Sequence, residues 1–147
     1  MPNLFPTFDP PELVEDSSQN TIQYPKSWLY DFERGGVVVD GSGRVVIADG
    51  LTAWAQWCIK TASTLRFAHL AYGPDYGCEL ENARKQPTRK AVESALIRVI
   101  TEALVIDPRT EVIRDFSFQW RGDEAYVSFT AVPVIGDPQR LEVKINA

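Results

Sequence analysis

The chain has 147 residues, a formal net charge of −5 and a hydrophobic content of 44%. A chain of this length folds as one domain and buries a sizeable core without disulfides or metals. Its acidity and the absence of a long Lys/Arg run argue against nucleic acid and anionic membrane surfaces as partners. No stretch reaches the roughly 20 apolar residues of a membrane span.

Cysteine and histidine are scarce, with Cys58, Cys78 and His69 as the complete set. Three such residues are too few for a structural zinc site, which takes about four ligands. The N-terminus lacks the basic start and apolar run of a signal peptide. We therefore expect a soluble protein made in a reducing cytosol, with two free thiols, no metal and no cofactor.

Residues 1–25 are predicted to form an extended arm ahead of a single domain over residues 26–147. Prolines interrupt any regular element there, at Pro2, Pro6, Pro10, Pro11 and Pro25. Its acids include Glu12, Glu15 and Asp16, and its apolar residues include Leu4, Phe5, Phe8, Leu13 and Val14. So many apolar side chains are unusual for a solvated tail. Two interpretations stay open, a disordered arm or an arm that orders against a partner or its own domain.

The first regular elements of the domain are a hairpin and a helix. Two β-branched runs, Val37–Val39 and Arg44–Ile47, flank the glycine-containing turn Asp40–Gly43, which predicts a β-hairpin. From Asp49 to Leu65 the apolar residues recur at helical spacing, and Asp49 is a suitable N-cap. Trp57 lies off the apolar stripe, so we expect it to pack against another element of the domain.

A strand and a second helix are expected next. The apolar run in "RFAHLAY", Arg66–Tyr72, has the length of a strand, and His69 within it is interpreted as a hydrogen-bonded structural histidine. The second helix begins after Thr88, its predicted N-cap. It ends at Asp107–Pro108, because the residue before proline is disfavoured in the α region. Its broad apolar face comprises Val92, Ala95, Leu96, Val99, Ile100, Ala103 and Leu104.

The last third of the chain alternates apolar and polar residues in three runs, which predicts three strands with one covered face. The apolar positions are Val112, Phe116, Phe118 and Trp120, then Ala125, Val127, Phe129 and Ala131, then Leu141, Val143 and Ile145. Pro133 is expected at a strand end, a bulge or an edge. The predicted fold class is α+β, an antiparallel β-meander packed against two α-helices, with an N-terminal β-hairpin and an extended Pro-rich N-terminal arm.

Catalytic motifs are absent from the sequence. There is no nucleophile elbow, P-loop or dinucleotide-binding fingerprint. The acids Asp75, Glu79 and Glu81, with Tyr72 and Tyr76, offer a pair of carboxylates such as glycoside hydrolysis requires. A solvated acidic loop explains them better, so we predict no catalytic residues and keep a cell-wall muramidase as the alternative function.

Asp107, Pro108 and Arg109 stand at the joint between the second helix and the first long strand. Proline fixes its own backbone, so the acid and the arginine are held in a defined relative direction. The planar guanidinium makes bidentate bonds that lysine cannot make. Spacing alone favours an ordinary helix stop with an exposed arginine, and the alternative is a docking knob.

The order of these segments resembles the baseplate wedge proteins of contractile-tailed phages. More narrowly, it is similar to the prophage XkdS-like branch of the sheath-initiator family, members of which have also carried a lysozyme label. The resemblance covers about Tyr24 to Val143. Its most specific segments are "AYGPDYGCELE" and "DPRTEV…FSF".

The resemblance implies a structural protein of the virion tail baseplate, assembled in the host cytoplasm, with six copies around the tail tube. Its implied partners are a larger baseplate wedge protein, tail sheath subunits, and tail tube or hub proteins. Sheath subunits would attach by strand addition to an open sheet edge. The family's acid-Pro-Arg motif, which docks on wedge helices, falls on Asp107, Pro108 and Arg109. The family motif more often begins with glutamate, and Asp107 is one methylene shorter. We expect Arg109→Ala to weaken wedge binding and leave the fold intact.

Overall fold

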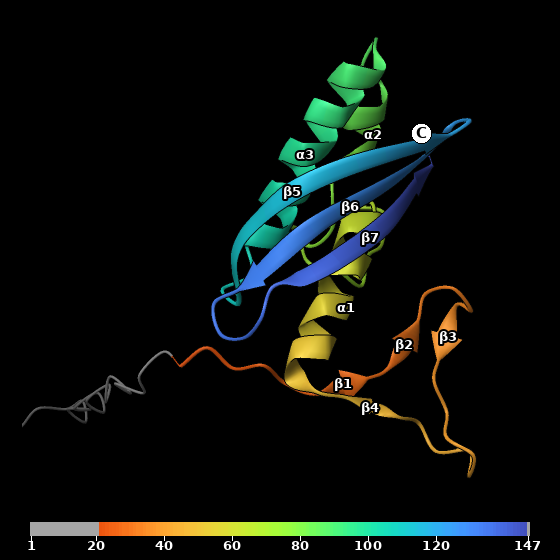
Figure 1. Ribbon diagram of the computed structural model, residues 1–147, viewed down its shortest axis with the longest axis vertical. Coiled ribbons are helices and arrows are strands. Elements are labelled where there is room, and N and C mark those ends of the chain that lie inside the picture. The colour runs from red at the N-terminus through yellow and green to blue at the C-terminus, as the bar shows by residue number, and fades with distance from the viewer. Residues whose placement is uncertain (1–20, 147) are drawn as a thin grey trace, which may run out of the picture.

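The computed structural model describes residues 21–146, which form an α+β fold as predicted (Figure 1). A three-stranded antiparallel sheet in the order β5-β6-β7 has α1 and α3 on one face, and four short strands form a separate region below it. The helices are α1 (Gly50–Ser63), α2 (Leu80–Arg84) and α3 (Arg89–Val105). The strands are β1 (Ser27–Trp28), β2 (Tyr30–Asp31), β3 (Gly36–Val37), β4 (Ile47–Ala48), β5 (Thr110–Arg121), β6 (Glu124–Pro133) and β7 (Gln139–Asn146).

The core lies between the sheet and the two long helices. The predicted inward residues of β6 and β7 are all buried: Ala125, Val127, Phe129, Ala131, Leu141, Val143 and Ile145. The helices contribute Trp54 and Cys58 from α1 and Leu96, Ile100 and Leu104 from α3, all 0% exposed. Such burial removes most of the apolar surface from water and is the main term that holds the two layers together.

The predicted alternation of buried and exposed residues is wrong at the beginning of strand β5. Ile113 is buried at 6% exposure, whereas Val112, which we expected to face inward, is 42% exposed. The pairing of β5 with β6 shifts between Arg114 and Ser117, and Asp115 lies in the left-handed region at φ 56°. A bulge adds a residue to one strand, so it inverts the phase of the alternation. Beyond the bulge, the predicted inward residues Phe116, Phe118 and Trp120 do pack on the core.

Both predicted N-caps are present. Asp49 accepts a hydrogen bond from the Thr52 N–H of α1, and Thr88 accepts one from the Ala91 N–H of α3. These side chains satisfy backbone donors that have no partner within a helix. The prediction of two helices was incomplete, because the five-residue α2 packs against α3.

The strand expected over Arg66–Tyr72 is absent, and this segment consists of turns and bends. Its apolar character is real, but Phe67 is 75% and Leu70 108% exposed, so no partner strand covers them within the described part of the chain. We expected a hydrogen-bonded structural histidine at His69, but it is exposed and contacts the Tyr72 ring edge-on. A short apolar run does not distinguish a strand from a loop by itself.

The predicted hairpin is present before α1, and a third segment that contains Leu29 is bonded to both of its arms. Val39 bridges Val45 across the turn at Asp40–Gly43. The flanking strands do not pair with each other, since β1 pairs with β4 and β2 with β3. Three backbone bonds close a ring: Leu29 N–H to Val46 C=O, Val46 N–H to Val38 C=O, and Val38 N–H to Leu29 C=O, at 2.8, 2.9 and 2.8 Å.

Most of the predicted arm, residues 1–20, lies outside the described residues. Residues 21–25 have no regular secondary structure, and they run past the end of α3 toward β1. The Tyr24 hydroxyl donates to the carbonyl of Arg109 at 3.0 Å and accepts from the Ile135 N–H at 3.2 Å. This attachment fixes the point at which the arm meets the domain. In the described residues, no helix combines the length and hydrophobicity needed to cross a membrane.

Candidate partner-docking site

Asp107, Pro108 and Arg109 form a tight corner between α3 and β5. The Asp107 N–H donates to Leu104 C=O at 3.3 Å, and the Thr110 N–H donates to Asp107 C=O at 3.0 Å. The Asp107 Oδ1 also accepts from the Arg109 N–H at 2.9 Å. Aspartate is short enough to bond the backbone two residues ahead, which is the reason it is favoured in turns. The shorter side chain of aspartate therefore has a local structural role at this position.

The side chains of Asp107 and Arg109 bind each other. The Arg109 Nε donates to Asp107 Oδ1 at 2.8 Å, and Nη2 donates to Oδ2 at 2.7 Å. The two side chains are only 15% and 12% exposed for arginine and aspartate. The hydrogen bonding of the guanidinium to the Asp107 carboxylate is the largest cause of the raised pKa of Arg109. The guanidinium is thus an internal element of the corner, so we expect Arg109→Ala to reduce stability as well as any partner binding.

The backbone of Arg109 connects the corner to the rest of the domain. Its carbonyl accepts from the Val134 N–H at 2.9 Å and from the Tyr24 hydroxyl. Next to it, the buried Thr110 Oγ1 accepts from Trp54 Nε1 at 3.1 Å. The corner therefore joins the arm, α1, β5 and the β6–β7 loop.

Two α1 side chains lie against this charged pair. The Arg109 guanidinium carbon is 5.5 Å from the centre of the Trp57 ring, a cation–π distance. Trp57 thus packs against another element, as its position off the helical stripe predicted. Burial raises the pKa of the Cys58 thiol to about 12, and the nearby Asp107 carboxylate adds to the effect while Arg109 opposes it. Cys58 and Cys78 are both free, as predicted, and both are buried.

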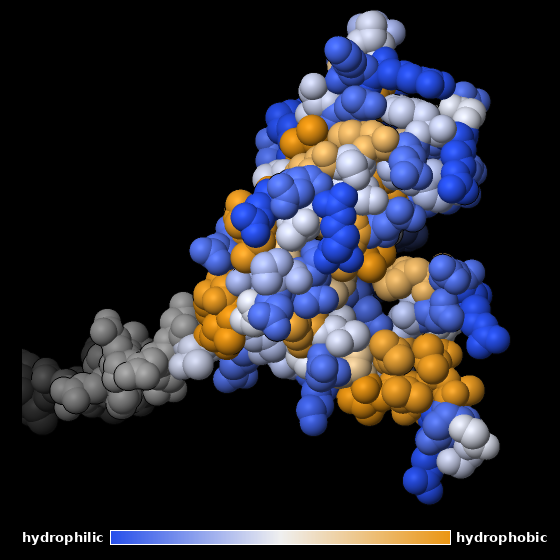
Figure 2. Space-filling model, in the orientation of Figure 1, coloured by the Kyte–Doolittle hydropathy of each residue, from blue (hydrophilic) through white to orange (hydrophobic). Residues whose placement is uncertain are grey.

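Exposed apolar side chains surround the corner, and we call them the corner patch: Val105, Ile106, Pro108, Val134 and Ile135. The first two end α3, and the last two lie in the β6–β7 loop, held to the corner through Arg109 and Tyr24. Val105, Ile106, Val134 and Ile135 are 45–59% exposed. Figure 2 shows hydrophobic side chains gathered over the β6–β7 loop.

Sequence reasoning singled out only Asp107, Pro108 and Arg109, and it missed Val134 and Ile135. The available signal was their position, because both are apolar and follow Pro133, where the strand ends. Apolar residues beyond a strand end have no place in that strand's alternation. Contiguous exposed apolar residues with a polar rim are typical of protein interaction sites.

The three acids considered for the alternative enzyme function lie in different local environments. Glu79 pairs with Arg66 at 3.4 Å, Asp75 is an exposed turn residue, and Glu81 lies in α2. Glu79 and Glu81 line a hollow of about 450 Å³, whereas Tyr72 and Tyr76 line a different one. Within residues 21–146, no cluster of three or more His, Cys, Asp or Glu side chains could hold a metal ion.

The sheet has two outer strands, and they differ in regularity. Strand β5 contains two register shifts and the left-handed Asp115. Strand β7 pairs all eight of its residues with β6 without a shift. Among the described residues, no backbone hydrogen bond joins β7 to any segment other than β6. Its free edge therefore presents unpaired N–H and C=O groups in a regular row.

The amino-acid sequence is similar to that of a known protein family. The family model described as contractile injection system sheath initiator matches residues 26–134. The chain therefore belongs to this family, and its role is structural and connected with the sheath of a contractile injection system. It is similar to the phage-like element PBSX protein XkdS of Bacillus subtilis strain 168, with 29% identity over 135 residues, which cover 90% of this chain and 89% of that protein.

Proposed function

We propose that the protein is a non-enzymatic baseplate component that docks on a larger wedge protein around the tail tube and templates sheath polymerisation by β-strand addition. The observation that carries this proposal is the regular free edge of β7 in a chain of the sheath-initiator family. An incoming extended segment gains a row of main-chain hydrogen bonds at such an edge.

Strand β7 is a better acceptor than β5. Bulges twist an edge away from incoming strands, and β5 has one between Arg114 and Ser117. Arg140 reaches across β6 and donates to the Asp115 carbonyl at 2.5 Å and the Ser117 hydroxyl at 2.9 Å, which holds that distortion in place. The two outer strands thus differ in a way that gives the sheet one receptive edge.

The register of the sheet identifies which backbone groups of β7 are available to an incoming strand. Arg121 and Glu124 flank a two-residue turn, and in a hairpin of this kind the two flanking residues form a hydrogen-bonded pair. Hydrogen-bonded pairs alternate along antiparallel strands, so β6 turns the peptide groups of Ala125, Val127 and Phe129 toward β7. By the same alternation, the N–H groups of Arg140, Glu142 and Lys144 point outward from the sheet. Sheath segments would pair there.

The corner patch is the proposed contact with the wedge protein. Asp107, Pro108 and Arg109 fall on the family's docking motif, and the apolar side chains around them supply desolvated area. The internal Asp107–Arg109 pair makes the corner rigid before binding, which reduces the entropy lost on docking. Loss of a charge-assisted contact at such an interface typically costs about 2–5 kcal/mol.

Several further features follow from the family and are part of the same proposal. The protein is placed in six copies around the tube, next to tail tube or hub proteins, and it joins the virion tail during assembly in the host cytoplasm. No catalytic, cofactor or metal site is assigned to it.

The experiment is electron microscopy of particles produced by a phage that carries an early stop codon in this gene. The proposal predicts tubes or tail parts without an anchored sheath. Complete tails that fail only to breach the cell wall would contradict it and would favour the muramidase. A turbidity assay on purified peptidoglycan, with Glu79→Gln and Glu81→Gln variants, then tests that activity directly.

A further inference from the structure

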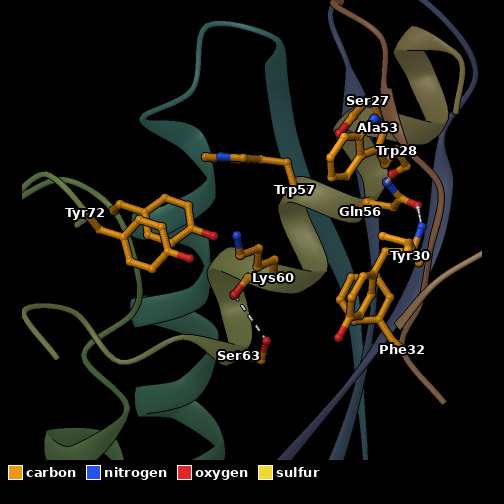
Figure 3. A pocket seen from close by; sticks show the side chains of 12 residues that line it. Ser27, Trp28, Tyr30, Phe32, Ala53, Gln56, Trp57, Lys60, Ser63 and Tyr72 are labelled. Atoms are coloured by element: carbon orange, nitrogen blue, oxygen red, sulfur yellow. Dashed lines mark hydrogen bonds between the residues drawn. The ribbon is translucent and has the colours of Figure 1, made fainter. Parts of the chain in front are cut away.

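A second exposed apolar region lies away from the corner patch, where α1 meets the short strands and the loop before α2. It forms a groove of about 590 Å³, a size within the range of roughly 300–1,000 Å³ that ligand clefts occupy. Aromatic side chains dominate its walls: Trp28, Tyr30, Phe32, Trp57, Tyr72 and Tyr76. Figure 3 shows these walls on either side of α1, with Trp57 and Tyr72 facing one side and Trp28, Tyr30 and Phe32 the other.

Hydrogen bonds and ring contacts hold the groove in shape. Gln56 on α1 accepts from the Tyr30 N–H at 2.7 Å and donates to the Trp28 C=O at 3.0 Å, so it fixes the short strands to the helix. On the other wall, the Tyr72 and Tyr76 rings lie 4.4 Å apart, and Trp57 meets Tyr76 edge-on at 6.5 Å. The surface is thus formed before any ligand arrives.

Two polar groups in the groove have capacity left for a ligand. The Tyr76 hydroxyl oxygen is buried and has no hydrogen-bond partner among residues 21–146. A buried hydroxyl without a partner is costly, and a carbonyl oxygen from a ligand would satisfy it. Lys60 is the one charged side chain among the described residues that line the groove, and its ammonium lies 5.1 Å from the centre of the Tyr72 ring.

These features define the chemistry of the ligand. Proline-rich segments in the polyproline II conformation dock on aromatic grooves, and they form no internal hydrogen bonds, so their carbonyls are free to accept. A carboxylate in the segment would pair with Lys60. The groove therefore suits a proline-rich, acidic, partly apolar peptide.

We propose that this groove binds the N-terminal segment of the same molecule, around Pro6–Pro11. Residues 1–20 contain four prolines and no Lys, Arg or His, and their acids are Asp9, Glu12, Glu15 and Asp16. Phe5 and Phe8 add aromatic side chains to the proline segment. The inference does not depend on the proposed role in sheath assembly.

The attachment point of the segment supports an intramolecular complex. Tyr24 fixes the chain to Arg109, and the Arg109 guanidinium contacts Trp57, which lines the groove. Fifteen extended residues span roughly 50 Å, and a compact chain of this length has a radius of gyration of about 15 Å. The tether is therefore long enough, and short tethers give effective concentrations in the millimolar range.

Indole NMR of the full-length protein provides the test. The four tryptophans give four Nε1–H signals, and a nitroxide on Thr7→Cys would broaden those near the segment. The native thiols are buried and stay unlabelled. We expect the Trp28 and Trp57 signals to lose most of their intensity. Trp120, whose Nε1 donates to Glu93 near the beginning of α3, should keep its intensity and serves as the internal reference.

Two variants make the test specific. Pro10→Ala with Pro11→Ala should restore the Trp28 and Trp57 signals, and Tyr76→Phe should restore them in part by removing only the unpartnered hydroxyl. Absence of broadening at Trp28 and Trp57 in the labelled protein would overturn the proposal. A mixture of spin-labelled unenriched chains with enriched unlabelled chains should show no broadening. Comparable broadening in that mixture would overturn the assignment to the same molecule.

Discussion

Arg109 and Asp107 hold each other through two parallel hydrogen bonds, and the same carboxylate also caps the Arg109 backbone N–H. Sequence spacing alone favours an exposed arginine at an ordinary helix stop, but in the structure this arginine is part of the framework of the corner. Its carbonyl ties the arm and the β6–β7 loop to the same point. Pre-organisation of this kind would favour the proposed docking of the surrounding corner patch, because little conformational freedom would be lost on binding.

Asp107→Asn is expected to lower the free energy of unfolding by about 1–3 kcal/mol, since it removes the charge of a mostly buried pair but keeps the oxygen that caps Arg109. Urea unfolding measures the change. The matched control is Arg98→Ala, which breaks the exposed ion pair with Glu102 and should cost no more than about 0.5 kcal/mol. Equal effects of the two variants would contradict an internal role for the corner pair.

Gly50→Ala is expected to destabilise the protein by about 1–3 kcal/mol, although alanine is the better helix former. A Cβ at Gly50 would collide with the backbone carbonyl and Cβ of Tyr24. Thermal unfolding gives the comparison with Gly41→Ala, whose added Cβ would meet nothing within 4 Å. A Gly50→Ala variant as stable as Gly41→Ala would show that residues 21–25 are not held where the structure places them.

Alkaline pH should reveal the two buried thiols. Burial raises the pKa of Cys58 and of Cys78 from 9.0 to about 12. Both groups stay neutral in the fold while the unfolded chain ionises, so their contribution is complete below pH 9 and is lost as pH rises from about 9 to 12. Stability should fall across that window. At pH 8 a thiol reagent should label neither cysteine in the native protein and both in denaturant, and fast native labelling would refute the burial.

Asp115→Gly is expected to stabilise the protein by about 0.5–1 kcal/mol, because glycine adopts the left-handed conformation without a Cβ penalty. The bond from Arg140 is made to the Asp115 carbonyl, so the substitution retains it. The control is Asp123→Gly in the β5–β6 turn, which has no positive φ and should be destabilised. Denaturant midpoints rank the two variants, and a loss of stability at residue 115 would contradict the bulge geometry.

Local signals predicted much of the fold. The caps Asp49 and Thr88 and the alternation of β6 and β7 each depend on residues close in sequence. Those features are set by hydrogen bonds to the next turn or by a period of two, so they are legible without tertiary contacts. The two free thiols also agree with expectation.

The remaining features depend on contacts between distant residues. The bulge in β5 inverts the inward face at Val112 and Ile113, and Arg140 from another strand binds the bulge. The exposed loop over Arg66–Tyr72 has the composition of a strand without a partner to pair with. The corner patch exists because residue 109 holds residue 134 beside it. Periodicity along the chain contains no information about such juxtapositions.

The most direct test of the proposed function is sheath polymerisation from baseplates that contain Glu142→Pro. Proline removes one outward N–H from the free edge of β7 and leaves the pairing with β6 intact, as edge strands allow. Glu142→Ala is the matched control, because it removes the same side chain, including its bond with Ser128, and keeps the N–H. Thermal unfolding verifies that both variants are folded. We expect electron micrographs to show sheath starting from Glu142→Ala baseplates and rarely from Glu142→Pro baseplates. Equal sheath initiation by the two variants would contradict strand addition at this edge.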